Sequence, residues 1–278
     1  MKEEWRYYNH AMLPNCAPHR TPDISIMGKK EFWKNDNGKV IMSRWTSNFD
    51  CGTETKWWYV IKDDVYDIST LKSKRRYEIN KGKKNFRVEI INPKKFINQI
   101  IDIQKKAYEQ YPRKYRPTVN ESKIIDDIKS WGENIKIFGA FSVADSSLCG
   151  YAMVIEFEEY ANFSMLKVIP DYEKLGINAA IVSSILDNYN SKLEGNYYIC
   201  DGERALLHET NFQDYLEKYF GFRKAFCKLN VKYRFPISFV ILLVSPFERF
   251  LSSNNGIIAK LKVLIQYKVI SEEQDKRR

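Results

Sequence analysis

The chain of 278 residues is basic, with 45 Lys and Arg against 35 Asp and Glu and a formal net charge of +10. Its 44% hydrophobic and 29% charged residues are typical of a globular protein, and its start carries acidic residues rather than a secretory signal. We therefore expect a cytoplasmic protein that is attracted to polyanions, anionic lipids or phosphorylated substrates. The five cysteines form no Cys-x-x-Cys pair, which fits reduced thiols, and we expect no metal site.

The N-terminal part contains little regular patterning. Residues 1–30 hold three of the nine prolines and no sustained hydrophobic period, so we expect an irregular arm over the surface. Two runs rich in β-branched and aromatic residues between positions 38 and 60 predict strands. We assign 31–92 to an N-terminal half, 93–235 to a C-terminal domain and 236–278 to an extension.

The most basic part of the chain lies at residues 69–87. The pattern predicts a helix that is capped by Ser69 or Thr70, buries Leu71, Ile79 and Tyr77, and ends near Gly82. A solvated helix face is one interpretation of the charge. The other is a phosphate-binding surface for a nucleotide, tRNA or anionic glycolipid, with Arg75 and Arg76 in contact with the substrate. Eight cations stand against one acid, Glu78: Lys72, Lys74, Arg75, Arg76, Lys81, Lys83, Lys84 and Arg87.

The middle of the chain alternates helical and strand-like patterns. Helices are predicted at 94–111 and 121–131, and strands at 135–143 and 148–158. Tyrosine offers a stacking surface and arginine fixed phosphate donors, so we predict substrate binding in the loop between the helices; an exposed connector is the alternative. The residues concerned are Tyr111, Arg113, Tyr115 and Arg116.

Residues 161–235 show the clearest order of elements. A strand at 161–170 stops at a proline, and a helix that follows Gly176 carries isoleucines at helical spacing. A strand at 195–202 ends in Asp-Gly. A helix at 210–221 and a strand at 225–235, whose apolar and basic residues alternate, complete the segment.

This order of strand, glycine-containing loop, helix, strand, helix and strand resembles the C-terminal half of the GNAT acyltransferase fold. Residues 168–178 resemble the acyl-CoA loop of that superfamily; Gly176 matches the family pattern, and Glu173, Lys174 and Asn178 depart from it. Residues 215–224 resemble the closing helix and strand, and the basic segment resembles an element of the FemAB-like branch. The resemblance implies an α/β fold with a mixed central sheet flanked by helices, in one half or two related halves.

The same resemblance implies the co-substrate. Acyl-CoA is the expected donor and aminoacyl-tRNA the alternative. Backbone amides at a helix N-terminus favour a pyrophosphate, because their N–H groups are unpaired and the helix dipole attracts anions. For Gly176, a tight strand-to-helix turn is the alternative role. The predicted donor-binding residues are Lys174, Leu175, Gly176, Ile177 and Asn178.

Three residues are predicted to take part in catalysis. Tyr219 lies where many GNAT enzymes carry a tyrosine that protonates the leaving thiolate; core packing is its alternative role. Glu156, on a central strand, is a candidate base if it is desolvated, and a solvent-facing acid otherwise. Asp201 ends a strand at the edge where open α/β sheets bind ligands. Arg204, in the loop that follows, is a candidate contact for the acceptor.

The C-terminal extension is apolar. Residues 236–246 are too few to span a bilayer, so we expect either a buried strand or an exposed docking patch. Residues 256–270 predict a helix that packs against the domain or, alternatively, lies on an anionic membrane. The second alternative would place segment 236–270 in peripheral contact with the inner membrane face.

Taken with the resemblance, these patterns predict an acyltransferase. The acceptor would be an amine or hydroxyl on a small molecule, or on a glycan- or lipid-linked precursor of the cell envelope or surface polysaccharide, with tRNA or another polyanion as a further partner. The rival hypothesis is a non-catalytic binding module on the same scaffold. The sequence contains no Gly-x-Ser-x-Gly elbow, P-loop or dinucleotide fingerprint, which disfavours those enzyme classes.

Overall fold

The computed structural model describes residues 4–36, 38–113, 116–206, 211–250 and 256–275. The chain divides into two compact units. Unit 1 comprises residues 1–59, 203–210 and 224–278, and unit 2 comprises residues 60–202 and 211–223. The predicted boundaries assume consecutive segments, whereas the chain leaves unit 1 and returns to it twice.

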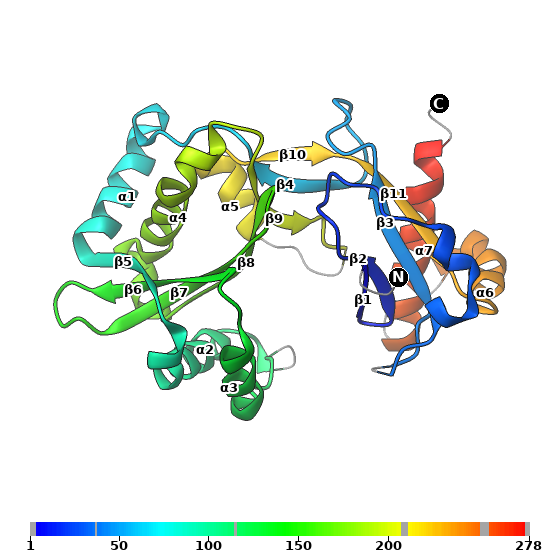
Figure 1. Cartoon of the computed structure of the whole chain (residues 1–278), viewed down its shortest axis with the longest axis horizontal. Coiled ribbons are helices and arrows are strands. Elements are labelled where there is room, and N and C mark those ends of the chain that lie inside the picture. The colour runs from blue at the N-terminus through cyan, green and yellow to red at the C-terminus, as the bar shows by residue number, and fades with distance from the viewer. Residues whose placement is uncertain (1–3, 37, 114–115, 207–210, 251–255, 276–278) are drawn as a thin grey trace. The chain divides into compact units, whose positions relative to one another are not determined.

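The larger sheet is mixed and has the strand order β10-β4-β9-β8-β7-β6-β5, of which β5 to β8 lie entirely in unit 2 (Figure 1). Strands β5 to β8 are antiparallel neighbours, and β8 and β9 run parallel. This mixed sheet with flanking helices confirms the predicted fold class. The strands are β4 (Trp58–Lys62), β5 (Phe86–Ile91), β6 (Ile135–Ser142), β7 (Leu148–Glu156), β8 (Tyr160–Val168), β9 (Tyr198–Glu203) and β10 (Arg223–Phe226).

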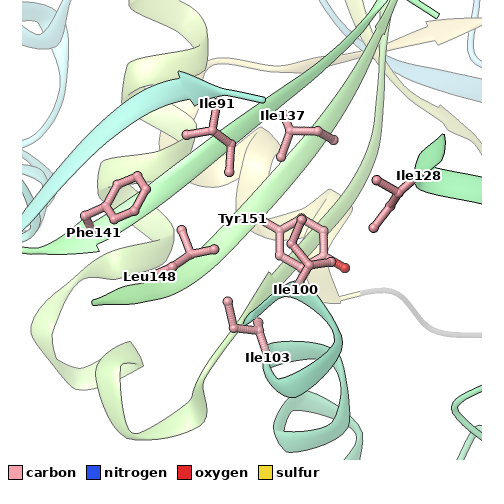
Figure 2. Packing of buried hydrophobic residues seen from close by; sticks show 8 residues of the cluster. All are labelled: Ile91, Ile100, Ile103, Ile128, Ile137, Phe141, Leu148 and Tyr151. Carbon is pink, nitrogen blue, oxygen red and sulfur yellow. The ribbon is translucent and has the colours of Figure 1, made fainter. Parts of the chain in front are cut away.

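Helices cover both faces of this sheet. Helices α1 (Ser73–Asn85) and α4 (Ile177–Leu193) lie on one face, and α2 (Ile97–Glu109) and α3 (Glu121–Ser130) on the other (Figure 1). Helix α5 (Asn211–Phe220) follows β9. Helix α2 places its isoleucines at helical spacing, so that one face packs on the strands. Figure 2 shows this core, which contains Ile91, Ile100, Ile103, Ile128, Ile137, Phe141, Leu148 and Tyr151.

Helix α1 differs from its predicted form in two ways. Leu71 is half-buried and precedes the helix, and Tyr77 is 70% exposed, so only Ile79 of the three side chains predicted to be buried lies in the core. The helix also continues past Gly82 to Asn85. The reason is tertiary: Gly82 packs against the backbone at Gly176, where the absence of a side chain permits close approach.

Unit 1 contains a second sheet with the order β1-β2-β3-β11. Its strands are β1 (Trp5–Tyr8), β2 (Ala11–Pro14), β3 (Met42–Ser47) and β11 (Lys228–Tyr233). The prediction of an irregular arm over residues 1–30 is therefore wrong. Asn9 and His10 adopt positive φ angles of 45° and 66° and turn the chain between β1 and β2, and Trp5 and Met12 are buried in one hydrophobic cluster.

The last predicted strand, at 225–235, is two strands in different sheets. The backbone N–H of Cys227 donates to the carbonyl of Trp57 at 3.0 Å, between the end of β10 and the start of β11. The apolar run after it forms helix α6 (Ile237–Val244), not a strand. Helix α7 (Gly256–Asp275) packs against β11, with Ile265 and Ile270 buried. In the described part of the chain, no helix has the length and apolarity to cross a membrane.

Candidate active site

Strands β8 and β9 separate along their length. They pair only at Tyr160, Ala161 and Asn162 with residues 198–200, although β8 continues to Val168 and β9 to Glu203. Parallel strands that separate toward their carboxyl ends mark the edge where open α/β sheets bind ligands. At the same level, the ring of Phe212 on α5 contacts the ring of Phe163 on β8, with centroids 5.4 Å apart.

Asp201 lies on β9 directly after the last paired residue. Burial raises the pKa of its carboxyl group to about 7, and a hydrogen bond from the Gln213 side chain of α5 acts in the opposite direction. A carboxyl that titrates near neutrality can accept a proton and release it again under cellular conditions. Asp201 is thus suited to general base catalysis.

Arg75 of α1 contacts the aromatic face of α5. Its guanidinium carbon lies 3.6 Å from the centre of the Tyr219 ring and 5.3 Å from that of Tyr215. The side chain is buried, and its Nη1 pairs with Glu78 Oε2 at 2.8 Å. Among the described residues, no atom accepts a hydrogen bond from the Arg75 Nε. A buried donor without an acceptor is costly, so a ligand carboxylate, phosphate or carbonyl oxygen could bind here.

The loop predicted to bind the donor lies against α1. The 3-10 helix η6 (Pro170–Leu175) leads to Gly176, which has a φ angle of 85°. A side chain there would come within 2.8 Å of the Glu78 carbonyl, and one on Gly82 would overlap the Gly176 carbonyl. Gly176 and Ile177 are buried, and Lys174 is exposed. The glycine is thus required for contact between two helices, whatever the loop binds.

Two hydrogen bonds connect the same loop to α1. Lys81 Nζ donates to the carbonyl of Lys174 at 2.8 Å, and Asn85 Nδ2 to that of Leu175 at 3.4 Å. The Asn178 Oδ1 is buried and has no donor among the described residues. The basic helix and the predicted donor loop, far apart in sequence, therefore form one surface of unit 2.

Several of the eight cations of the basic segment, residues 72–87, have partners within the fold. Arg76 donates to the carbonyls of Ser69 and Leu71, Lys83 pairs with Asp187 at 2.9 Å, and Arg87 pairs with Glu89. Of the eight cations of this segment, all of them in the described part of the chain, Lys72, Lys74 and Lys84 are exposed and have no such partner. The basic surface is thus smaller than the sequence suggests.

Glu156 lies at the other end of the sheet. It pairs with Ala161 at the start of β8, whereas the donor loop follows the end of β8, about 25 Å farther along the strand. Its carboxylate forms ion pairs with Lys192 at 3.2 Å and Lys136 at 3.8 Å. This environment stabilises the structure and keeps Glu156 away from the donor loop.

The loop after α2 is shaped by its own hydrogen bonds. Arg116 Nη2 donates to the carbonyl of Glu109 at 2.6 Å, which caps the C-terminus of α2. Tyr111 is 44% exposed and contacts Tyr108, with ring centroids 5.8 Å apart. Arg113 is exposed, and Tyr115 lies outside the described residues.

Arg204 belongs to unit 1, unlike the other candidate residues. Its guanidinium carbon lies 4.7 Å from the centre of the Trp58 ring, and its Nη1 donates to the carbonyl of Lys56 at 2.6 Å. These two contacts explain the position of the Arg204 side chain, and no ligand is needed to explain it.

No pattern in the sequence indicates a functional role for Lys167. This β8 residue lies on the α2 face, with its Nζ 4.8 Å from the centre of the Tyr108 ring. Burial lowers its pKa, and no carboxylate in the described part of the chain pairs with it. Beside the same helix, a cavity of about 530 Å³ is lined by residues that include Asp102, Lys106 and Tyr172. In the described residues, no three His, Cys, Asp or Glu side chains form a group that could hold a metal.

Solved structures similar to this chain include FemX, at 8% identity and a TM-score of 0.47, over 60% of this chain and 59% of FemX. L-PGS from Bacillus licheniformis is similar over 85% of this chain and 82% of its own, at 12% identity and a TM-score of 0.47. An aminoglycoside acetyltransferase from an uncultured soil metagenomic sample matches 49% of this chain and 87% of its own, at 12% identity and a TM-score of 0.36.

FemX and GNAT-type acetyltransferases are among these neighbours, as the sequence resemblance implies. No protein-family model matches the chain, and no curated protein does. At such identities and TM-scores the neighbours carry no weight for activity or substrate, which depend on the residues of the site.

Proposed function

We propose that this protein is an acyltransferase in which Asp201 is the general base. The observation that carries the proposal is the near-neutral pKa of Asp201, at the point where β8 and β9 separate. An amine or hydroxyl of the acceptor attacks the acyl carbonyl and loses its proton to Asp201. The bond from the carbonyl carbon to the carrier then breaks, and Tyr219 gives a proton to the departing oxygen or sulfur.

Arg75 gives this reaction a positively charged partner. Its buried Nε has no acceptor among the described residues, and its guanidinium lies on the Tyr219 ring. A carbonyl or phosphate oxygen of the donor bound at Nε would lie close to the proposed acid, Tyr219. The proposed donor is acyl-CoA or aminoacyl-tRNA, and the proposed acceptor is an amine or hydroxyl on a cell-envelope or surface-polysaccharide precursor.

Transfer of a labelled acyl group tests the proposal. The purified protein is given acetyl-CoA or charged tRNA together with amino sugars, sugar nucleotides and amino acids, and products are detected by mass spectrometry. Asp201→Asn should slow transfer by about 100-fold or more while donor affinity is retained. Asp214→Asn, a matched change at an exposed position on α5, should transfer at the wild-type rate. Equal rates for Asp201→Asn and the wild type would exclude the proposed base.

The salt dependence of donor binding distinguishes the two classes of donor. If the donor is a tRNA, replacing Lys72, Lys74 and Lys84 by Gln should weaken binding and reduce its salt dependence, because each cation lost removes a phosphate contact. If the donor is acyl-CoA, the same triple variant should bind it with little change. Replacement of Gly176 cannot distinguish the two donors. Gly176 contacts Gly82, so a side chain at position 176 would disturb the fold itself.

A second candidate function is a non-catalytic module that binds a polyanion. The burial of the predicted donor loop against α1 favours it. Gly176 and Ile177 are buried, so their amides are less accessible than those of an open anion site. In that case charged and uncharged tRNA would bind equally, the triple variant would lose both, and Asp201→Asn would alter neither.

A further inference from the structure

Helix α6 in unit 1 exposes an unusual amount of apolar surface. Fourteen large apolar side chains in the described part of the chain are exposed, and six of them fall between residues 235 and 247. The helix itself, Ile237–Val244, contains no charged residue, and Ile241 is its buried anchor. The exposed fractions are 79% for Phe235, 56% for Phe239, 41% for Val240, 58% for Leu242, 55% for Leu243 and 59% for Phe247. Apolar patches of this kind on a protein surface mark sites of interaction.

The width of the apolar face of α6 distinguishes a partner helix from a membrane. At about 100° per residue, Phe239, Val240, Leu242 and Leu243 cover an arc of roughly 160° opposite Ile241. Pairing with a second helix uses a narrower stripe, two positions in every seven residues. A wide apolar arc is instead typical of helices that lie in a membrane interface.

The charge around the helix determines the kind of lipid. Residues 228–270 contain seven cations and one acid, Glu248. Lys232 at the end of β11 and Lys260 in the first turns of α7 are exposed, and α7 contacts both β11 and α6. Cations beside an apolar helix strengthen its attachment to a bilayer that carries negative charge.

We propose that α6, together with Phe235 and Phe247, inserts into the headgroup region of an anionic membrane and holds the protein there peripherally. The helix has eight residues, about 12 Å, so it lies in the interface and does not cross the bilayer. This attachment is independent of acyl transfer. It would bring a lipid-linked substrate and the protein to the same surface.

Flotation with vesicles tests this attachment. The full chain should float with vesicles of phosphatidylcholine and phosphatidylglycerol and bind pure phosphatidylcholine far more weakly. The triple variant Phe239→Ser, Leu242→Ser, Leu243→Ser should lose affinity for the mixed vesicles by about 100-fold or more. The matched control, Ile90→Ser with Val143→Ser, removes two exposed apolar side chains of unit 2 and should float like the wild type.

A second variant separates the two contributions. Lys232→Gln with Lys260→Gln should weaken binding to the mixed vesicles and leave binding to pure phosphatidylcholine unchanged. Circular dichroism of every variant should match the wild type, because all the replaced side chains are exposed. The proposal is overturned if the wild type does not bind mixed vesicles, or if the triple variant binds them equally well. It is also overturned if light scattering shows a dimer that the triple variant dissociates, since the patch would then bind a second copy.

Discussion

The guanidinium carbon of Arg75 lies 3.6 Å from the centre of the Tyr219 ring. The two residues come from α1 and α5, and each was a candidate site residue for a separate reason. Their contact makes the basic helix and the candidate acid parts of one cluster. Buried cation–aromatic contacts of this kind contribute about 2 kcal/mol to stability.

Replacement of Tyr219 should separate its two roles. Tyr219→Phe keeps the ring on Arg75 and removes the hydroxyl, so the free energy of unfolding should change by less than about 1 kcal/mol. If the hydroxyl protonates the leaving group, transfer should fall by about 100-fold. Tyr219→Leu should lose transfer and about 2 kcal/mol of stability as well, as measured by urea unfolding. A Phe variant with wild-type activity would show that the residue only packs.

The titration of Asp201 should appear in the pH dependence of stability. Its pKa is about 7 in the folded chain and 3.8 as the ordinary value, so between these values the folded state binds more protons than the unfolded state. The group therefore destabilises the fold progressively as pH rises from about 4 to about 7, by on the order of 4 kcal/mol in total. Urea unfolding of Asp201→Asn should lack this decline. Parallel pH profiles for wild type and variant would contradict the raised pKa.

Contact between Gly82 and Gly176 predicts an unusual effect of alanine. In an exposed helix interior, Gly→Ala stabilises by up to about 1 kcal/mol. Gly82→Ala should instead destabilise by about 2 to 3 kcal/mol, because the added methyl overlaps the Gly176 carbonyl. Gly28→Ala, where nothing lies within 4 Å of the added atom, is the control and should be nearly neutral. Stabilisation by Gly82→Ala would mean that α1 does not lie directly on the loop.

Lys167 provides a prediction in which stability and function change in opposite directions. Lys167→Met removes a partly buried cation and keeps its packing volume, so the free energy of unfolding should rise. If Lys167 binds an anionic group of the acceptor, the acceptor KM should rise while the donor KM is unchanged. Lys123→Met, at an exposed position on α3, should change neither. A variant that loses stability would indicate an anionic partner already present in the fold.

The sequence predicted most of unit 2, because its elements have strong local signals. The isoleucine spacing of α4 and the proline after β8 place those elements within one or two residues. The same local rules failed where contacts between residues far apart in the sequence determine the structure. Gly82 was expected to end α1, yet it serves a contact with Gly176, and the hairpin of β1 and β2 depends on burial of Trp5.

The candidate site was only partly accessible to sequence reasoning. A position such as Asp201 can be located from the end of a strand, but its pKa depends on burial that only the folded chain provides. Lys167 carries no sequence signal, since its role depends on Tyr108 of another element. The sequence also leaves open whether α6 is buried or exposed. An apolar run of eight residues is equally suited to a core or to a surface.

The most direct test of the proposed mechanism is the rate of acyl transfer in a single turnover, measured from pH 5.5 to pH 8.5 for the wild type, Asp201→Asn and Asp214→Asn. The wild type and Asp214→Asn should show a rate that rises with pH and is half-maximal near the pKa of Asp201, about 7. Asp201→Asn should be slower by about 100-fold and lack this rise. A rise that persists in Asp201→Asn at an undiminished rate would contradict the assignment of Asp201 as the base.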